Sequence, residues 1–154
     1  TYIDDKNLNF RLGGKLMIFS PQKNDGLWSS LRTSLGRNQK TNQGYLYSEF
    51  INTIRINSWM ATNISSKYFF SGVKSFGALG ISKYINLSDN ILIIPEINIQ
   101  FSEESESNNS ISLRYSYSPS KSIDIYYSTA TGIQDLGQNL QGKEKFGMKL
   151  NFNY

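Results

Sequence analysis

The chain has 154 residues, a net charge of +4, no cysteine and no histidine. This length fits a single domain, and the absence of histidine removes the commonest general base and metal ligand, so we expect neither an enzyme nor a cofactor or metal site. The longest apolar run, residues 91–95, is far shorter than the roughly 20 residues of a membrane-spanning helix. Lysines and arginines are scattered singly, which gives no support for nucleic acid as a partner.

Apolar and polar residues alternate along much of the chain. Because successive side chains of a strand point to opposite faces, this period of two predicts strands with one apolar face and one polar face. An all-β protein is therefore expected. In chain order the clear examples are residues 7–19, 26–36, 90–101, 110–118 and 122–132.

The middle of the chain is harder to assign. In residues 45–59, Leu46, Phe50 and Ile54 share one phase, but Ile51 interrupts it. A strand is expected here, and an amphipathic helix over residues 49–59 is the alternative. The remaining expected strands are residues 64–72 and 76–85.

The last ten residues, 145–154, alternate without interruption. One side carries Phe146, Met148, Leu150, Phe152 and Tyr154, and the chain stops on that aromatic residue. The segment resembles the closing strand of bacterial outer-membrane β-barrels of the porin-like kind, although Tyr154 replaces the more usual phenylalanine. The resemblance implies an antiparallel up-and-down transmembrane β-barrel in the bacterial outer membrane. It also implies that these five residues are the signal read by the barrel assembly machinery, with outer-membrane lipid as a further partner.

The connections between the expected strands differ in length. Short turns are expected at residues 20–25, 86–89 and 118–122, and longer loops at residues 37–44, 102–109 and 133–144. Counting back from a periplasmic Tyr154 places every short turn on the periplasmic side and every long loop outside, provided that residues 45–85 form three strands.

This count gives about nine strands, whereas single-chain bacterial barrels normally have an even number. We therefore expect a preceding strand to be missing, residues 1–6 to be the tail of an external loop, and the chain to be the C-terminal part of a larger barrel. A complete eight-stranded barrel is the alternative if the middle of the chain is miscounted.

If the polar strand faces line a lumen, their charged residues determine its charge. The well-phased strands contribute Arg11, Lys15, Arg32, Arg114, Lys145 and Lys149 against Glu96 and Asp124. Six cations against two anions favour the passage of anions through a water-filled pore. Glu96 is expected to pair with Arg114 on the next strand. The alternative is that all of these charges pair or are solvated inside a narrow, plugged barrel.

The predicted function is porin-like passive diffusion of small polar or anionic solutes. Two alternatives remain open: a closed barrel with a structural or adhesive role, and a soluble lipocalin-like barrel that binds an apolar ligand. The strand at residues 90–101 distinguishes them. If its isoleucines line a closed interior, the membrane interpretation is wrong, and if they form an external belt, it is favoured.

Overall fold

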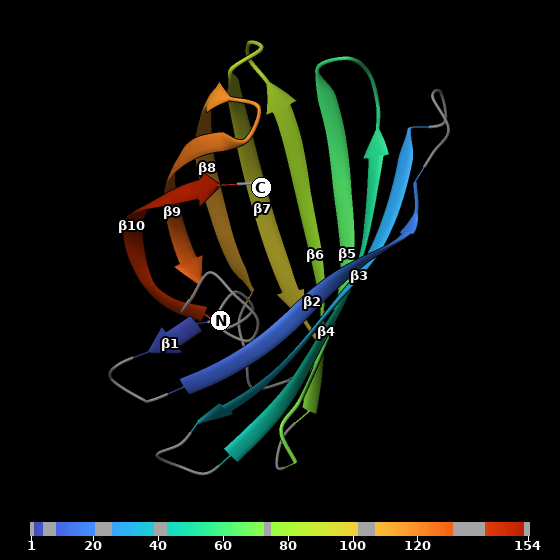
Figure 1. The fold of residues 1–154 in the computed structure, drawn as a ribbon, viewed down its shortest axis with the longest axis vertical. Helices are drawn as coiled ribbons and strands as arrows, with labels where there is room; N and C mark the ends of the chain where they lie inside the picture. The colour runs from blue at the N-terminus through green and yellow to red at the C-terminus, as the bar shows by residue number, and fades with distance from the viewer. Residues whose placement is uncertain are drawn as a thin grey trace.

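The computed structural model of the protein describes residues 2–4, 9–20, 26–38, 43–72, 75–101, 107–130 and 141–152. These residues form one antiparallel sheet of nine long strands with a short strand at one edge (Figure 1). In order, the strands are β1 (Tyr2–Asp4), β2 (Asn9–Phe19), β3 (Leu27–Asn38), β4 (Gln43–Arg55), β5 (Met60–Phe70), β6 (Ser75–Asn86), β7 (Ile91–Gln100), β8 (Asn108–Ser118), β9 (Lys121–Ala130) and β10 (Gln141–Phe152). No helix in the described part of the chain is long and apolar enough to cross a membrane.

Each strand pairs with the next one along the chain, so the sheet is a simple up-and-down meander. The connections therefore alternate between two ends. Those after β2, β4, β6 and β8 lie at one end, which we call the turn end, and the others lie at the opposite loop end. The three predicted short turns fall at the turn end and the three predicted long loops at the loop end. The loop predicted at residues 37–44 is shorter than expected, because β3 continues to Asn38 and β4 begins at Gln43.

All nine predicted strands are present. Residues 45–59 lie mostly in β4, so the strand assignment is correct and the helical alternative is wrong. Cross-strand pairing on both sides of β4 outweighs the break in its apolar pattern at Ile51. The expectation that residues 1–6 are only the tail of a loop is wrong, because Tyr2–Asp4 pairs with Asn9–Arg11 as β1. Three residues are too few for a period of two to be visible in the sequence.

The sheet is strongly curved but not closed (Figure 1). Among the described residues, β10 pairs with β9 and with no other strand. Because eight hairpin connections separate them, β2 and β10 run in the same direction, and β1 runs in the opposite direction. An antiparallel partner for β10 must therefore have the direction of β1.

Two neighbouring glycines of β2, Gly13 and Gly14, face opposite sides of the sheet. The space around each shows how tightly its side is packed. A Cβ atom on Gly13 would lie 2.9 Å from the Ser34 Cβ atom and 3.2 Å from the Thr33 carbonyl oxygen. A Cβ atom on Gly14 would meet nothing within 4 Å. The strand can approach β3 this closely only because residue 13 has no side chain.

We predict that Gly13→Ala lowers the free energy of unfolding by about 1–3 kcal/mol, because the added methyl group overpacks the contact with β3. Gly14→Ala should leave stability unchanged or raise it by up to about 1 kcal/mol, because it restricts the unfolded chain without meeting a neighbour. Urea unfolding of the two variants measures the difference. Equal stability of the two would contradict the register between β2 and β3.

Candidate functional site

The two faces of the sheet have opposite polarity. Buried residues are mostly polar: twelve polar or charged residues are buried, against four hydrophobic ones, Tyr47, Phe69, Ala78 and Ala130. In the same described residues, 28 large hydrophobic side chains are exposed. This is the reverse of the usual distribution, in which large aliphatic residues are buried and charged residues are almost never buried.

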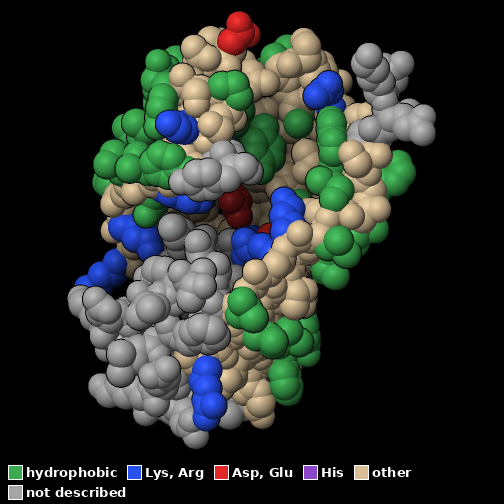
Figure 2. Space-filling view, viewed as in Figure 1, with side chains coloured by type: hydrophobic (Ala, Val, Ile, Leu, Met, Phe, Trp, Pro, Cys, Tyr) green, Lys and Arg blue, Asp and Glu red, His purple; other side chains and the backbone are tan. Residues whose placement is uncertain are grey.

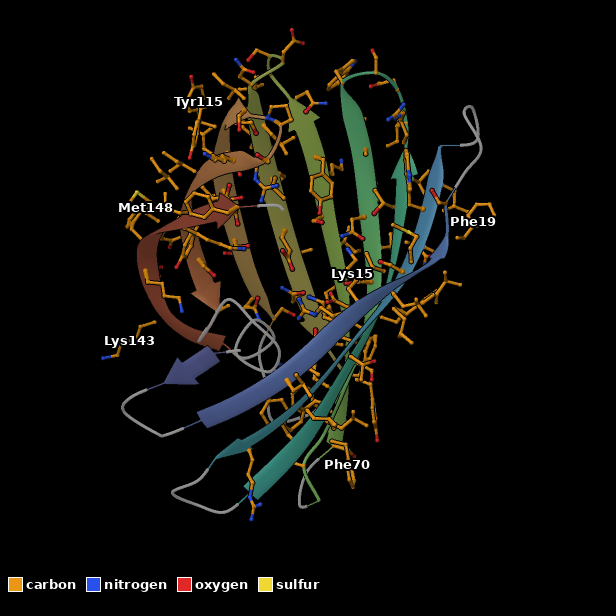
Figure 3. All side chains as sticks on the ribbon, viewed as in Figure 1. Lys15, Phe19, Phe70, Tyr115, Lys143 and Met148 are labelled. Carbon is orange, nitrogen blue, oxygen red and sulfur yellow. The ribbon has the colours of Figure 1, made fainter. Side chains whose placement is uncertain are left out.

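The convex face carries the exposed apolar side chains in cross-strand rows. Leu113, Ile125 and Met148 form one such row across β8, β9 and β10. Figure 3 shows Phe19, Phe70, Tyr115 and Met148 pointing away from the interior. The charged residues in phase with this face lie near strand ends: Arg37, Lys83, Lys121 and Glu144.

Ile91, Ile97 and Ile99 are exposed on this convex face, as the membrane interpretation requires. Phe146, Met148, Leu150 and Phe152, predicted as an assembly signal, are also exposed there. Tyr154 lies outside the described residues. The sequence alternation therefore assigns the faces of β7 and β10 correctly, whereas a role in assembly stays a prediction.

The concave face carries a row of charges across four strands. The register places Lys15 opposite Arg32, Arg32 opposite Glu49, and Glu49 opposite Lys67. The Arg32 Nε atom lies 3.3 Å from Glu49 Oε2, and the Lys67 Nζ atom lies 3.7 Å from Glu49 Oε1. One carboxylate thus lies between two cations.

The Lys67 side chain also extends away from β4, across β6 to β7. Its Nζ atom lies 3.3 Å from Glu96 Oε1 and donates a hydrogen bond to Asn98 Oδ1. The side chain passes over Gly80, where a Cβ atom would lie 2.8 Å from the Lys67 Cε atom. Gly80 therefore allows Lys67 to lie flat along the wall of the concave face. With 2% of its side chain exposed, Lys67 is a buried cation between two carboxylates.

A second row of charges crosses β8, β9 and β10. Arg114 donates two hydrogen bonds to Asp124, from Nε to Oδ1 at 2.7 Å and from Nη2 to Oδ2 at 2.8 Å. Lys149 lies opposite Asp124 in the register. Two parallel hydrogen bonds between a guanidinium and a carboxylate fix the geometry of both groups.

The predicted pair between Glu96 and Arg114 is wrong. The register places Glu96 opposite Ser110 and Arg114 opposite Leu92, so the two are four residues apart along the strands. Four residues correspond to about 13 Å, beyond the reach of a direct ion pair. Glu96 pairs instead with Lys67, two strands away.

Most of the residues predicted to line a lumen lie on the concave face. Arg32, Glu96, Arg114 and Asp124 belong to the two networks, and Lys15, Lys145 and Lys149 are in phase with them. Arg11 pairs through its backbone with Tyr2 and Gly36, and its side chain lies outside the described atoms.

Three charged residues of this face are missing from the sequence prediction: Glu49, Lys67 and Arg55. They lie in β4 and β5, where the alternation is broken or where Ser, Thr and Asn occupy both phases. A signal was present in β4, because Glu49 has the opposite phase to Leu46, Phe50 and Ile54. Lys67 likewise has the opposite phase to Ile64, Tyr68 and Phe70, although Phe69 shares its phase and obscures the signal.

The concave face has a positive charge balance. In the described inward positions of β2 to β9, and of β10 from Lys145 onward, there are seven cations and three carboxylates. Figure 2 shows acidic side chains deep in the hollow of the molecule, with lysine and arginine side chains around it. This surplus of four positive charges has the sign that the sequence predicted for the polar faces, although the residues that produce it differ.

Comparisons of the chain with protein-family models, with curated proteins and with solved structures find no significant match. What the protein does must therefore be inferred from its residues and their geometry.

We predict that Lys67→Met lowers the free energy of unfolding by about 3 kcal/mol, because it leaves Glu49 and Glu96 without the buried cation between them. Adding Glu49→Gln and Glu96→Gln to this variant should restore part of the loss, since the uncompensated charges are then removed. Urea unfolding provides the measurement. Lys83→Met, on the exposed convex face, is the matched control, and an equal loss in this variant would contradict the buried network.

Proposed function

We propose that the protein is a transmembrane β-barrel of the bacterial outer membrane that lets small polar solutes, and anions in particular, diffuse passively through its interior. The observation that carries the proposal is the reversed burial: polar residues on the concave face and 28 exposed large hydrophobic side chains. A belt of this extent exposed to water would favour aggregation, whereas lipid solvates it.

Strand length and the placement of aromatic residues support the same proposal. The nine long strands have 10 to 13 residues, and a tilted strand needs about 9–11 to cross the hydrocarbon core. Exposed aromatic residues occur at both ends of the convex face, where interfacial girdles lie in membrane barrels. They are Phe19, Trp59, Tyr117 and Phe152 at the turn end, and Phe70 and Phe101 at the loop end.

Closure of the barrel is also part of the proposal. A sheet edge cannot face lipid, because its backbone groups would have no hydrogen-bond partner there. We place β1, which pairs with β2 and has the required direction, between β2 and β10, and propose that it also pairs with β10 in antiparallel fashion. This arrangement gives an even number of strands, as in bacterial single-chain barrels.

The lipocalin-like alternative requires an apolar interior. The concave face instead holds two ion-pair rows, and six of the seven buried serines in the described chain are in phase with it. Such a surface offers hydrogen bonds rather than apolar contact to a ligand, and therefore favours water and polar solutes.

We predict that Leu113→Lys lowers the stability of the protein in phospholipid vesicles by about 2–4 kcal/mol, because Leu113 lies midway along β8 on the convex face and a lysine there enters the membrane. Ser112→Lys, on the concave face, should cost clearly less. Urea unfolding from vesicles measures both. If Leu113→Lys changes stability by no more than an ordinary surface substitution, the convex face does not contact lipid.

We predict a conductance with anion preference in planar bilayers under a KCl gradient. Lys15→Glu should shift the reversal potential toward cations, because it replaces an inward cation beside Arg32 with a carboxylate. Lys121→Glu, near a strand end on the convex face, is the control and should leave the potential unchanged. Insertion without conductance would replace the pore with the closed, structural barrel, and an unchanged potential in Lys15→Glu would remove Lys15 from the conduction path.

A further inference from the structure

A pocket of about 320 Å³ lies at the turn end of the concave face. The ends of β3, β4, β5 and β6 and the connection at residues 56–59 surround it. Its volume is at the lower limit for small-molecule sites, so a ligand would be the size of a single ring with one substituent. None of the residues of the charge rows described above lines it.

Arg55 is the charged residue of this pocket. Its guanidinium lies over the Trp28 ring, 5.2 Å from the ring centroid. No carboxylate forms an ion pair with Arg55 within the described residues, and neither Asp nor Glu lines the pocket. Stacking on tryptophan fixes the plane of the guanidinium while leaving its N–H groups available for a ligand.

The neighbouring polar groups are mainly donors. Asn57 accepts hydrogen bonds at Oδ1 from the backbone nitrogens of Trp59 and Met60, at 3.0 Å and 2.8 Å. Its side-chain amide nitrogen therefore remains available to donate a hydrogen bond to a ligand. Thr53 and Tyr84, whose hydroxyl groups can donate hydrogen bonds, line the same pocket. A fixed guanidinium with amide and hydroxyl donors around it matches the chemistry of an oxyanion.

Apolar surface completes the site. Trp28, Met60 and Ala61 line the pocket together with the Tyr84 ring. A ligand that carries its negative charge on a small apolar or aromatic body could place the charge on Arg55 and the body against these side chains. An inorganic ion would contact only the polar groups of the site and leave the apolar side chains without a partner.

We propose that this pocket binds a small organic oxyanion, a carboxylate or a phosphate ester, with Arg55 as the charge-recognising residue and Trp28 as the platform that orients it. The inference rests on the proposed function only in placing the site at the periplasmic mouth of the pore, where it would select among permeating anions. Binding itself requires no conduction.

The test uses the full chain folded in detergent micelles with Trp59→Phe, which leaves Trp28 as the single tryptophan. The probes are benzoate, phenyl phosphate, neutral benzamide, and chloride at matched ionic strength. Saturable changes in Trp28 fluorescence are expected with benzoate or phenyl phosphate and not with benzamide or chloride. The anion with the lower Kd identifies a carboxylate or a phosphate ester as the preferred group.

Arg55→Gln should weaken this binding by at least about tenfold, the factor expected for the loss of a charge-assisted hydrogen bond. Arg55→Lys keeps the charge without the planar fork and should bind with intermediate affinity, which provides a second variant if Arg55→Gln does not fold. Lys121→Gln removes one positive charge on the convex face and should bind as tightly as the parent.

Equal responses to benzamide and benzoate, an unchanged Kd in a folded Arg55 variant, or no saturable response from folded protein would each overturn the site. Binding without conductance in bilayers would overturn the pore and keep the site. Conductance without binding would do the opposite, so the two proposals fail separately.

Discussion

The hydrogen-bonded register of the meander is the constraint on which the other features depend. Because side chains alternate along each strand, the register assigns the residues of the nine long strands to one of two faces, apart from the irregularities near the ends of β2, β8 and β10. A slip of one residue would exchange the faces. The exposed row of Leu113, Ile125 and Met148 and the buried pair of Arg114 and Asp124 are one residue apart on the same strands. A slip would bury the apolar row and expose the ion pair, so the polarity of the two faces and the register enforce each other.

The same register makes the charged rows possible without filling the concave face. Long side chains can lie along a wall only where their neighbours are small. Lys67 crosses Gly80, and Ala78 and Ser65 are close by in the adjacent register positions. Small barrels commonly fill their interior with bulky side chains, whereas here six buried serines lie on the concave face. Small residues beside long cations give a wall that carries charge and leaves space above it.

Sequence reasoning predicts the strands and the faces well where the alternation is strict. In β10 from Lys145 on, and in β7 from Pro95 on, each apolar position is followed by a polar one, and the faces follow directly. It fails for contacts that depend on how neighbouring strands are aligned. The pairing of Glu96 with Lys67 rather than Arg114 depends on the register across β5, β6 and β7, which no single strand encodes. β1 has three residues, too few to show a period, and depends on β2 for its hydrogen bonds.

Along the strand direction, the concave face changes in character from one end to the other. Near the loop end, Tyr45, Phe69 and Phe76 stack with ring centroids 5.6 Å and 5.1 Å apart. The charge rows occupy the middle, where five cations lie among three carboxylates. At the turn end the Arg55 guanidinium rests on Trp28 and no described carboxylate neutralises it. A solute moving from the loop end would meet first an aromatic wall, then the charge rows with their surplus of cations, and last the single cation Arg55. The surplus of cations in the middle would already attract anions, and Arg55 would add a further positive charge at the turn end, so both levels of the concave face would favour anionic solutes.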